Sequence, residues 1–88
     1  MSIKKMKIDG YRIRIVYNDR GTEKYLKKVY LKKVDDSLLV QNIELVEKPE
    51  DKILVIEDIA TATIVRRQLK DIVMDGDSVE LEPVYSFE

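Results

Sequence analysis

The stretch from Tyr25 to Val65 constrains the fold most, because nearly all of its apolar residues are Ile, Leu, Val or Tyr and charged residues separate them. These residue types are enriched in β-strands. The pattern predicts three strands, over Tyr25 to Val34, Leu38 to Val46 and Lys52 to Val65. Short polar segments at 35–37 and 48–51 fit tight turns between them. Closely spaced turns favour neighbouring antiparallel strands, so we expect a meander.

Strands are also predicted on both sides of this stretch. Tyr11 to Tyr17 alternates apolar residues with Arg12 and Arg14, which is typical of a strand with one solvated face. The preceding residues fit either an edge strand from Met6 or a frayed basic tail. Near the other end, Val79 to Phe87 alternates strictly, and its internal Pro83 indicates an edge strand.

Two segments can be interpreted either as a helix or as a strand. Leu26, Val29, Tyr30 and Val34 would share one helical stripe, but we prefer a long strand over Tyr25 to Val34 that bulges partway.

The second ambiguous segment follows Ile53 to Ile56, a fully apolar run that is typical of a central strand. Ile59 to Val65 is then either a further strand or the start of a helix capped by Asp58, and Arg66 to Met74 can be helical in both cases.

Composition limits the chemistry that the chain can perform. At 88 residues it fits one small domain, 1–88, and its 38% charged residues exceed the usual quarter. The sequence contains no Cys and no His, so the usual zinc and haem ligands and the common catalytic nucleophile–base pairs are missing. We therefore expect neither an enzyme nor a bound cofactor or metal.

Location follows from hydropathy. The sequence has no apolar run long enough to cross a membrane, and Met1 to Gly10 lacks the apolar core of a signal peptide. These observations predict a cytoplasmic protein without a membrane partner.

Charge is strongly segregated along the chain. Residues 1–34 carry eleven Lys and Arg against three acids, net +8, and the remainder carries five against fourteen, net −9, within a total of −1. Three interpretations are open. Basic and acidic strands can pair with each other, a basic surface can bind a polyanion, or a charged patch can bind a protein. Adjacent carboxylates such as Asp35-Asp36 and Glu57-Asp58 sit at expected turns, which explains them without a metal site.

Several segments together resemble the small Sm-like or SH3-like barrels, and among them the bacterial YolD-like proteins. The segments are Ile13 to Tyr17, Val29 to Asp35, Ser37 to Val40 and Ile53 to Ile59. The resemblance implies a mostly β fold, a five- to six-stranded antiparallel barrel with one short helix. It also implies a binding module without enzymatic activity, often oligomeric and sometimes bound to nucleic acid. The alternative is a ferredoxin-like βαββαβ sandwich with helices at Glu23 to Val34 and Ile59 to Met74.

These observations predict a non-enzymatic module that acts through protein–protein contacts and self-associates through the edge strand Val79 to Phe87. The alternative function is binding of single-stranded RNA or DNA by the basic N-terminal part. The candidate binding residues are its cations and the tyrosines among them: Arg12, Arg14, Lys24, Tyr25, Lys27, Lys28, Tyr30, Lys32 and Lys33.

Overall fold

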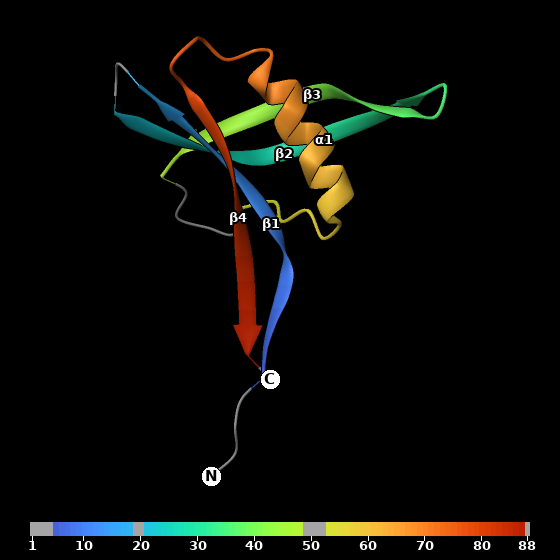
Figure 1. The fold of residues 1–88 in the computed structure, drawn as a ribbon, viewed down its shortest axis with the longest axis vertical. Helices are drawn as coiled ribbons and strands as arrows, with labels where there is room; N and C mark the ends of the chain where they lie inside the picture. Colours follow the sequence, from blue (N-terminus) through green and yellow to red (C-terminus); the bar gives the residue numbers. More distant parts are fainter. Residues whose placement is uncertain (1–4, 19–20, 49–52, 88) are drawn as a thin grey trace.

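The computed structural model describes residues 5–18, 21–48 and 53–87 of the chain. Its elements are β1 (Met6–Tyr17), β2 (Thr22–Val34), β3 (Ser37–Glu47), α1 (Ile59–Lys70) and β4 (Ser78–Phe87). Among the described residues, four strands form one antiparallel sheet in the order β3-β2-β1-β4 (Figure 1). The fold is therefore mostly β with one helix, as predicted. The expected five to six strands and closed barrel are not confirmed, because the sheet is open.

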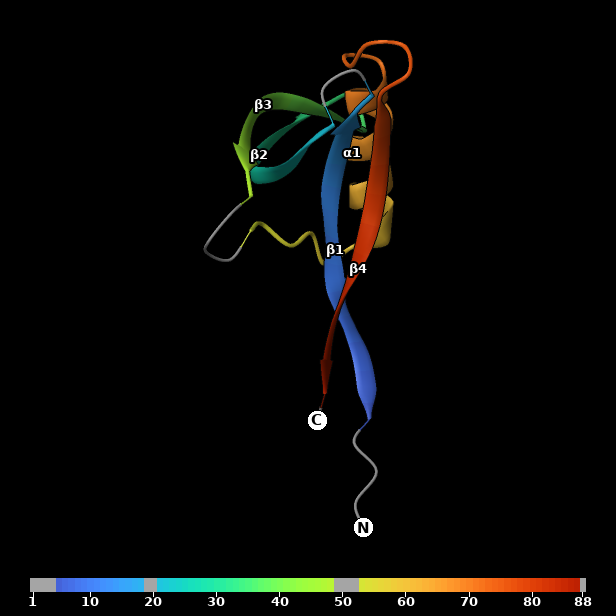
Figure 2. The same cartoon turned by 90° about the vertical axis from the view of Figure 1, so that its left-hand side faces the viewer.

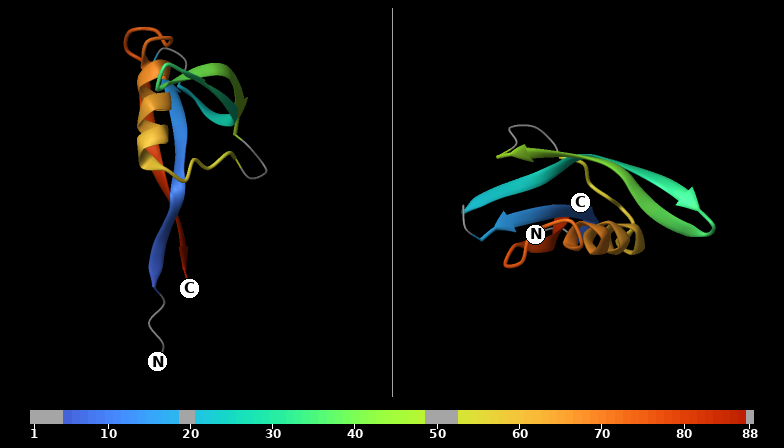
Figure 3. Two further views of the ribbon diagram at one scale, coloured as in Figure 1. Left: turned by 90° about the vertical axis from the view of Figure 1, so that its right-hand side faces the viewer. Right: turned by 90° about the horizontal axis from the view of Figure 1, so that it is seen from above.

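The sheet consists of two long ladders joined by a short one. β1 pairs with β4 over residues 6–16, and β2 pairs with β3 over residues 24–34. In contrast, β1 and β2 pair only from Arg14 to Tyr17. This short junction lets the β2–β3 pair cross the β1–β4 pair at a steep angle (Figures 2 and 3). We call the β1–β4 pair the ribbon.

Register shifts in the β2–β3 ladder decide which residues of these strands face the core. Lys27 is an extra residue in β2, and Gln41 is an extra residue in β3. Each extra residue reverses the alternation of its strand. Leu26, Val29 and Leu31 consequently all pack on the core, opposite Leu45, Ile43 and Val40. The predicted bulged strand is confirmed, and the alternative helix at Glu23 to Val34 is wrong.

The turn between β2 and β3 also follows the prediction. Asp35 and Asp36 have φ of 46° and 67°, the positive values of a two-residue type I′ hairpin turn. Of the other predicted turn, only Lys48 lies within the described residues. The predicted basic tail at 1–5 lies outside them except for Lys5.

Of the two alternatives for Ile59 to Val65, the helix capped by Asp58 is confirmed, and the strand predicted over Lys52 to Val65 is wrong. Asp58 caps the helix, accepting hydrogen bonds from the backbone N–H groups of Ala60 and Thr61 at 3.3 and 3.2 Å. Packing decides the rest, because residues 62, 65 and 69 follow the helical period and are buried, which overrides the strand preference of Thr, Ile and Val. The helix ends at Lys70, earlier than Met74. It is too short and too polar to span a membrane, as is every helix in the described ranges.

The run Ile53 to Ile56 is not a central strand, which corrects a second expectation. It makes a single antiparallel bridge, in which Ile56 and Tyr11 exchange two backbone hydrogen bonds of 2.8 Å. Leu54 is exposed. An apolar run alone does not reveal whether the sheet has a free neighbour to pair with.

The core lies between α1 and the sheet face that α1 covers. Its buried members are Ile13, Ile15, Leu26, Val65, Leu69 and Val79. Burial of each such side chain contributes roughly 1.5–3 kcal/mol. All of them come from the middle of the molecule, so the far half of the ribbon has no buried layer of its own.

Side chains of α1 bond to both outer strands of the sheet. The Gln68 amide nitrogen donates to the Leu38 carbonyl at 2.6 Å, and its oxygen accepts the Val40 N–H. On the other side, Arg66 Nε donates to the Val79 carbonyl at 2.8 Å. The helix therefore bridges β3 and β4, the two strands that a barrel would have joined directly.

Candidate interaction surface

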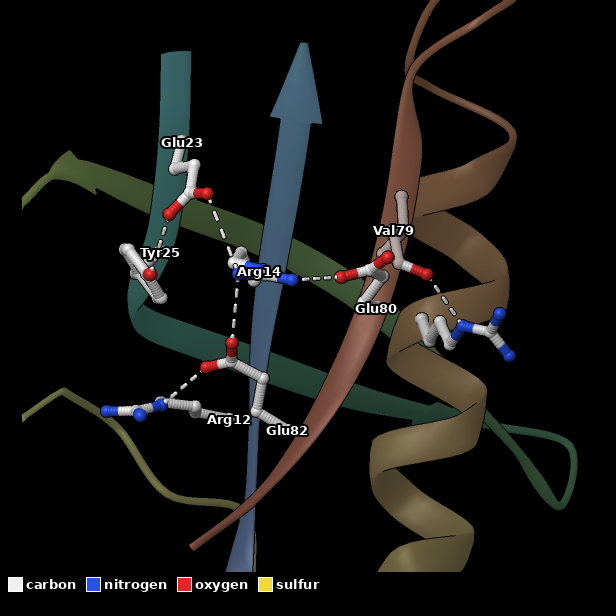
Figure 4. Close-up of polar contacts among 8 residues, drawn as sticks. Arg12, Arg14, Glu23, Tyr25, Val79, Glu80 and Glu82 are labelled. Carbon is white, nitrogen blue, oxygen red and sulfur yellow. Dashed lines mark hydrogen bonds and ion pairs between the residues drawn. The ribbon is translucent and has the colours of Figure 1, made fainter. Parts of the chain in front are cut away.

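Arg14, one of the predicted binding residues, lies at the centre of an ionic cluster on the outer face of the sheet, away from α1. It hydrogen-bonds to Glu80 and lies 3.3 Å from Glu82 and 3.6 Å from Glu23 (Figure 4). The hydrogen bond to Glu80, reinforced by the other carboxylates, raises the pKa of Arg14 against the opposing effect of burial. The positive charge of Arg14 is therefore balanced by carboxylates of the same protein.

Two further predicted residues belong to the same cluster. Arg12 Nε lies 2.8 Å from Glu82, and its guanidinium lies 5.9 Å from the centre of the Tyr25 ring. The Tyr25 hydroxyl donates to Glu23 at 3.1 Å. Burial, and next the hydrogen bond to Glu23, raise the pKa of Tyr25. Glu82 therefore balances the charge of Arg12, and Glu23 already accepts the Tyr25 hydroxyl.

Lysines of β2 also pair with carboxylates of a neighbouring strand. Lys24 lies 3.9 Å from Glu47 and Lys27 lies 3.4 Å from Glu44, both on β3. The sheet order places the acidic strands β3 and β4 outside the basic strands β2 and β1. These pairs match the first interpretation of the segregated charge, in which basic and acidic strands pair with each other.

The remaining predicted residues lie on the free part of the β2–β3 pair. Lys28, Tyr30 and Lys32 share its outer face, and Lys33 lies on the inner face, in alternation with them. All four side chains are exposed, and among the described residues none of the three lysines forms an ion pair. The structure thus divides the predicted set into a neutralised cluster and a small exposed group around Tyr30.

An exposed apolar surface on the ribbon was missed by the sequence analysis. Met6 pairs with Phe87 and Ile8 pairs with Tyr85, so the four side chains share one face. Their exposed fractions are 59%, 65%, 49% and 47%, respectively. We call Met6, Ile8, Tyr85 and Phe87 the ribbon patch. The alternation of β4 indicated an apolar face, but no sequence signal showed that this face continues past the helix.

The ribbon patch continues the core face of the sheet. Ile13 pairs with Leu81 and Ile15 pairs with Val79 on that face. The register shift between Ile8 and Gly10 brings Met6 and Ile8 onto the same face of the ribbon as Ile13 and Ile15. The ribbon extends beyond α1 toward the chain ends (Figures 1 and 2). Apolar residues that would be covered near the helix are therefore exposed here.

Within the part of the chain that the structure describes, the outer edge of β4 is unobstructed in its last part. The Val79 carbonyl accepts a hydrogen bond from Arg66, so the backbone groups of Val79 point away from β1. Every second residue of β4 after Val79 has the same orientation. Pro83, in the same phase, has no N–H to donate. Tyr85 and Phe87 follow beyond it. The predicted edge position of β4 is confirmed, with its first half obstructed by Arg66 and Pro83.

No protein-family model, curated protein or solved structure matches this chain. The resemblance to Sm-like, SH3-like and YolD-like proteins therefore stays a prediction. Within the described residues, no three carboxylate side chains gather closely enough to hold a metal ion.

Proposed function

We propose that the protein is a non-enzymatic, cytoplasmic binding module that acts through protein–protein contact and self-associates through the ribbon patch. The observation that supports this function is the gathering of four large, exposed apolar side chains on one face of a two-stranded ribbon. Exposed apolar surface of this kind marks interaction sites. The lack of His and Cys in the sequence supports the non-enzymatic part of the proposal.

A second copy of the chain fits this surface for a reason of symmetry. A twofold interface brings the same residues together from both copies, so the surface must be complementary to itself. The ribbon patch carries no charge and meets this condition. Its charged neighbours Lys7 and Asp9 lie in the opposite phase of β1, 4.0 Å from each other, and Ser86 donates to Asp9 at 2.9 Å.

The interface is small. A stable dimer buries roughly 800 Å² on each partner, more than four side chains supply, so we expect a reversible dimer with a Kd on the order of micromolar. Pairing of the free edges at Tyr85 and Phe87 would extend the contact.

The test is sedimentation equilibrium over a concentration series with two matched variants. Tyr85→Lys places a charge in the ribbon patch, and Leu39→Lys places one at a side chain that is equally exposed, 47%, on β3. We expect the wild type to dimerise, Tyr85→Lys to remain monomeric and Leu39→Lys to behave as the wild type. A wild type that stays monomeric at millimolar concentration, or a control that loses the dimer equally, contradicts the proposal.

Nucleic-acid binding is the competing function, and the exposed Tyr30 between Lys28 and Lys32 is the observation in its favour. Nucleic-acid binding by the same protein samples distinguishes this function from self-association. A polyanion binder retains single-stranded RNA or DNA with an affinity that falls steeply with salt and with Lys28→Gln plus Lys32→Gln, whatever its oligomeric state. Because four of the seven predicted cations, Arg12, Arg14, Lys24 and Lys27, already form ion pairs, we expect no such retention.

A further inference from the structure

β3 is an outer strand of the sheet, and α1 occupies the first part of its outer edge. There the Gln68 side chain bonds to the Leu38 carbonyl and the Val40 N–H. Among the described residues, 42–47 pair with β2 alone, and no other residue hydrogen-bonds to their backbone. The N–H and C=O groups on this part of the edge therefore have no partner in the described protein, which is the arrangement that accepts a further strand.

An apolar cavity of about 240 Å³ lies beside this unpaired part of β3. Ile43 and Leu45 of β3 form one wall, and Leu69 and Val73 form the wall at the C-terminal end of α1. Ile43 and Leu45 are two residues apart and share the inner face of the sheet, on which α1 packs. A strand added to the edge of β3 would continue this inner face, so its inward side chains would lie over the cavity.

The rim of the cavity is apolar, exposed and held in place. Ile72 and Met74 belong to the rim, and their side chains are 69% and 74% exposed. The backbone N–H groups of Ile72 and Val73 both donate to the Leu69 carbonyl, at 3.0 and 3.1 Å, and the Asp77 N–H donates to the Met74 carbonyl at 3.1 Å. Large apolar side chains that stay uncovered on such a hydrogen-bonded segment mark an interaction site.

The charges around the cavity indicate the kind of partner. Residues 70–77 carry three Asp against one Lys, and Asp71 and Asp75 are exposed and form no ion pair with a described residue. Glu44 and Glu47 of β3 are already paired with lysines of β2. If the β3 edges of two copies paired, their acidic segments would lie on the same side of the joined sheet and repel each other. A strand that carries positive charge is attracted instead.

We propose that the edge of β3 over 42–47 binds an extended, positively charged peptide segment of another protein as an added strand. The peptide exchanges backbone hydrogen bonds with 42–47, and two of its apolar side chains, from alternate residues, enter the cavity. Basic residues on either side of these two lie near Asp71 and Asp75. In this mode of peptide recognition, main-chain hydrogen bonds supply affinity and pockets for alternate side chains supply specificity.

The size of the cavity limits the size of the two side chains. A water molecule occupies about 30 Å³ in the liquid, so the cavity holds roughly eight non-hydrogen atoms, the number in two Ile side chains. The segment 71–77 lies at the opposite end of the molecule from the chain ends, and hence from the ribbon patch (Figure 1). The peptide site is therefore separate from the proposed self-association.

The test is a titration of the ¹⁵N-labelled wild type and of Tyr85→Lys, which removes the proposed dimer from the measurement. The probe is the blocked peptide Lys-Thr-Ile-Thr-Ile-Thr-Lys, whose Lys and Ile residues share one face of a strand. We expect both proteins to bind it equally, with chemical-shift changes at 42–47 and 71–74. Amide exchange should slow at every second residue of 42–47, because only alternate N–H groups point outward. No binding at millimolar peptide, or shifts confined to other regions, would overturn the proposal.

Three further peptides identify the contacts that hold the probe. Two are N-methylated on alternate residues, one on the Lys and Ile nitrogens and the other on the Thr nitrogens. Strand pairing uses only one of these sets, so one peptide should bind about tenfold more weakly and the other as the parent does. The third replaces both Lys by Glu and should bind at least about fivefold more weakly. An equal loss for both N-methylated peptides, or no loss for either, excludes strand addition, and unchanged affinity of the Glu peptide excludes a positively charged partner.

Two matched variants locate the site. Ile72→Gln makes the rim polar, and Ile59→Gln makes the same change at a side chain that is 53% exposed, at the start of α1, and does not line the cavity. We expect Ile72→Gln to bind the parent peptide about fivefold more weakly and Ile59→Gln to bind it as the wild type does. The spectra report whether each variant is folded. Equal effects of the two substitutions contradict the assigned site, and dimerisation of Tyr85→Lys through 42–47 without peptide binding would make a second copy the occupant, which also overturns the proposal.

Discussion

At Gly10, two segments far apart in the sequence come closer than a side chain would allow. A Cβ on this residue would lie 2.5 Å from Val55 Cγ1 and 2.8 Å from the Ile56 carbonyl oxygen. The neighbouring Tyr11 makes the two backbone hydrogen bonds that hold residues 53–56 against β1. The absence of a side chain at Gly10 is thus a condition for this crossing.

We expect Gly10→Ala to lower the free energy of unfolding by about 1–3 kcal/mol, because the backbone at Ile56 must move away and lose its bridge to Tyr11. Gly21→Ala is the control. Its added Cβ meets no atom within 4 Å, although its φ of 57° imposes a smaller backbone cost. Denaturant unfolding measures both. An equal or smaller loss for Gly10→Ala would show that residues 53–56 can shift without cost.

At the scale of elements, α1 connects the two outer strands of the sheet, as a further strand would in a closed barrel. Its Gln68 satisfies a donor and an acceptor on the edge of β3, and Arg66 satisfies an acceptor on the edge of β4. Outer strands that present unpaired backbone groups recruit other chains, so these side chains both join the sheet to the helix and obstruct its edges.

We expect Gln68→Leu to lower the free energy of unfolding by about 1–3 kcal/mol, since it leaves the Leu38 carbonyl and the Val40 N–H unpaired. Gln68→Glu should cost less, because it retains the acceptor for Val40. Arg67→Leu, on the exposed side of the same helix turn, should stay within about 0.5 kcal/mol of the wild type. Thermal unfolding ranks the three. The bridging role of Gln68 is wrong if Gln68→Leu and Arg67→Leu are equivalent.

The same elements show how far the sequence determines the fold. Periodicity was sufficient for β1 and β4. The bulge predicted within Tyr25 to Val34 is confirmed by the register shift at Lys27. Periodicity failed for Ile53 to Ile56 and for α1, where the outcome depends on which sheet edge is free and which face can be covered. Local propensity does not contain that information.

The candidate site was harder to predict than the fold, and for a similar reason. The segregated charge of the chain suggested a basic surface, but the strand order places Glu80 and Glu82 beside Arg12 and Arg14 and neutralises them. Of the predicted cations, Lys28, Lys32 and Lys33 near Tyr30 stay exposed and form no ion pair with a described residue. Pairing between residues distant in sequence thus places four of the seven predicted cations in ion pairs, which the sequence alone does not reveal.

For the whole molecule, the ribbon patch and the core predict an uneven distribution of stability. Ile13, Ile15 and Val79 are buried under α1, whereas Met6, Ile8 and Phe87 lie on a two-stranded extension that α1, the one helix among the described residues, does not cover. A two-stranded ribbon is marginal in water unless its apolar face is packed against something. The far half of the ribbon should therefore open locally without unfolding of the core.

Amide hydrogen exchange at two protein concentrations tests this distribution together with the proposed dimer. In dilute solution, amides of residues 6–8 and 85–87 should exchange at least about tenfold faster than those of Ile13, Ile15 and Val79. At high concentration, a second copy covers the ribbon patch, so exchange should slow in 6–8 and 85–87 and remain unchanged in the core. In Tyr85→Lys the far half of the ribbon should exchange rapidly at both concentrations. Slow exchange there in dilute solution would mean that the ribbon is stable alone, and concentration-independent exchange in the wild type would mean that no second copy covers the patch.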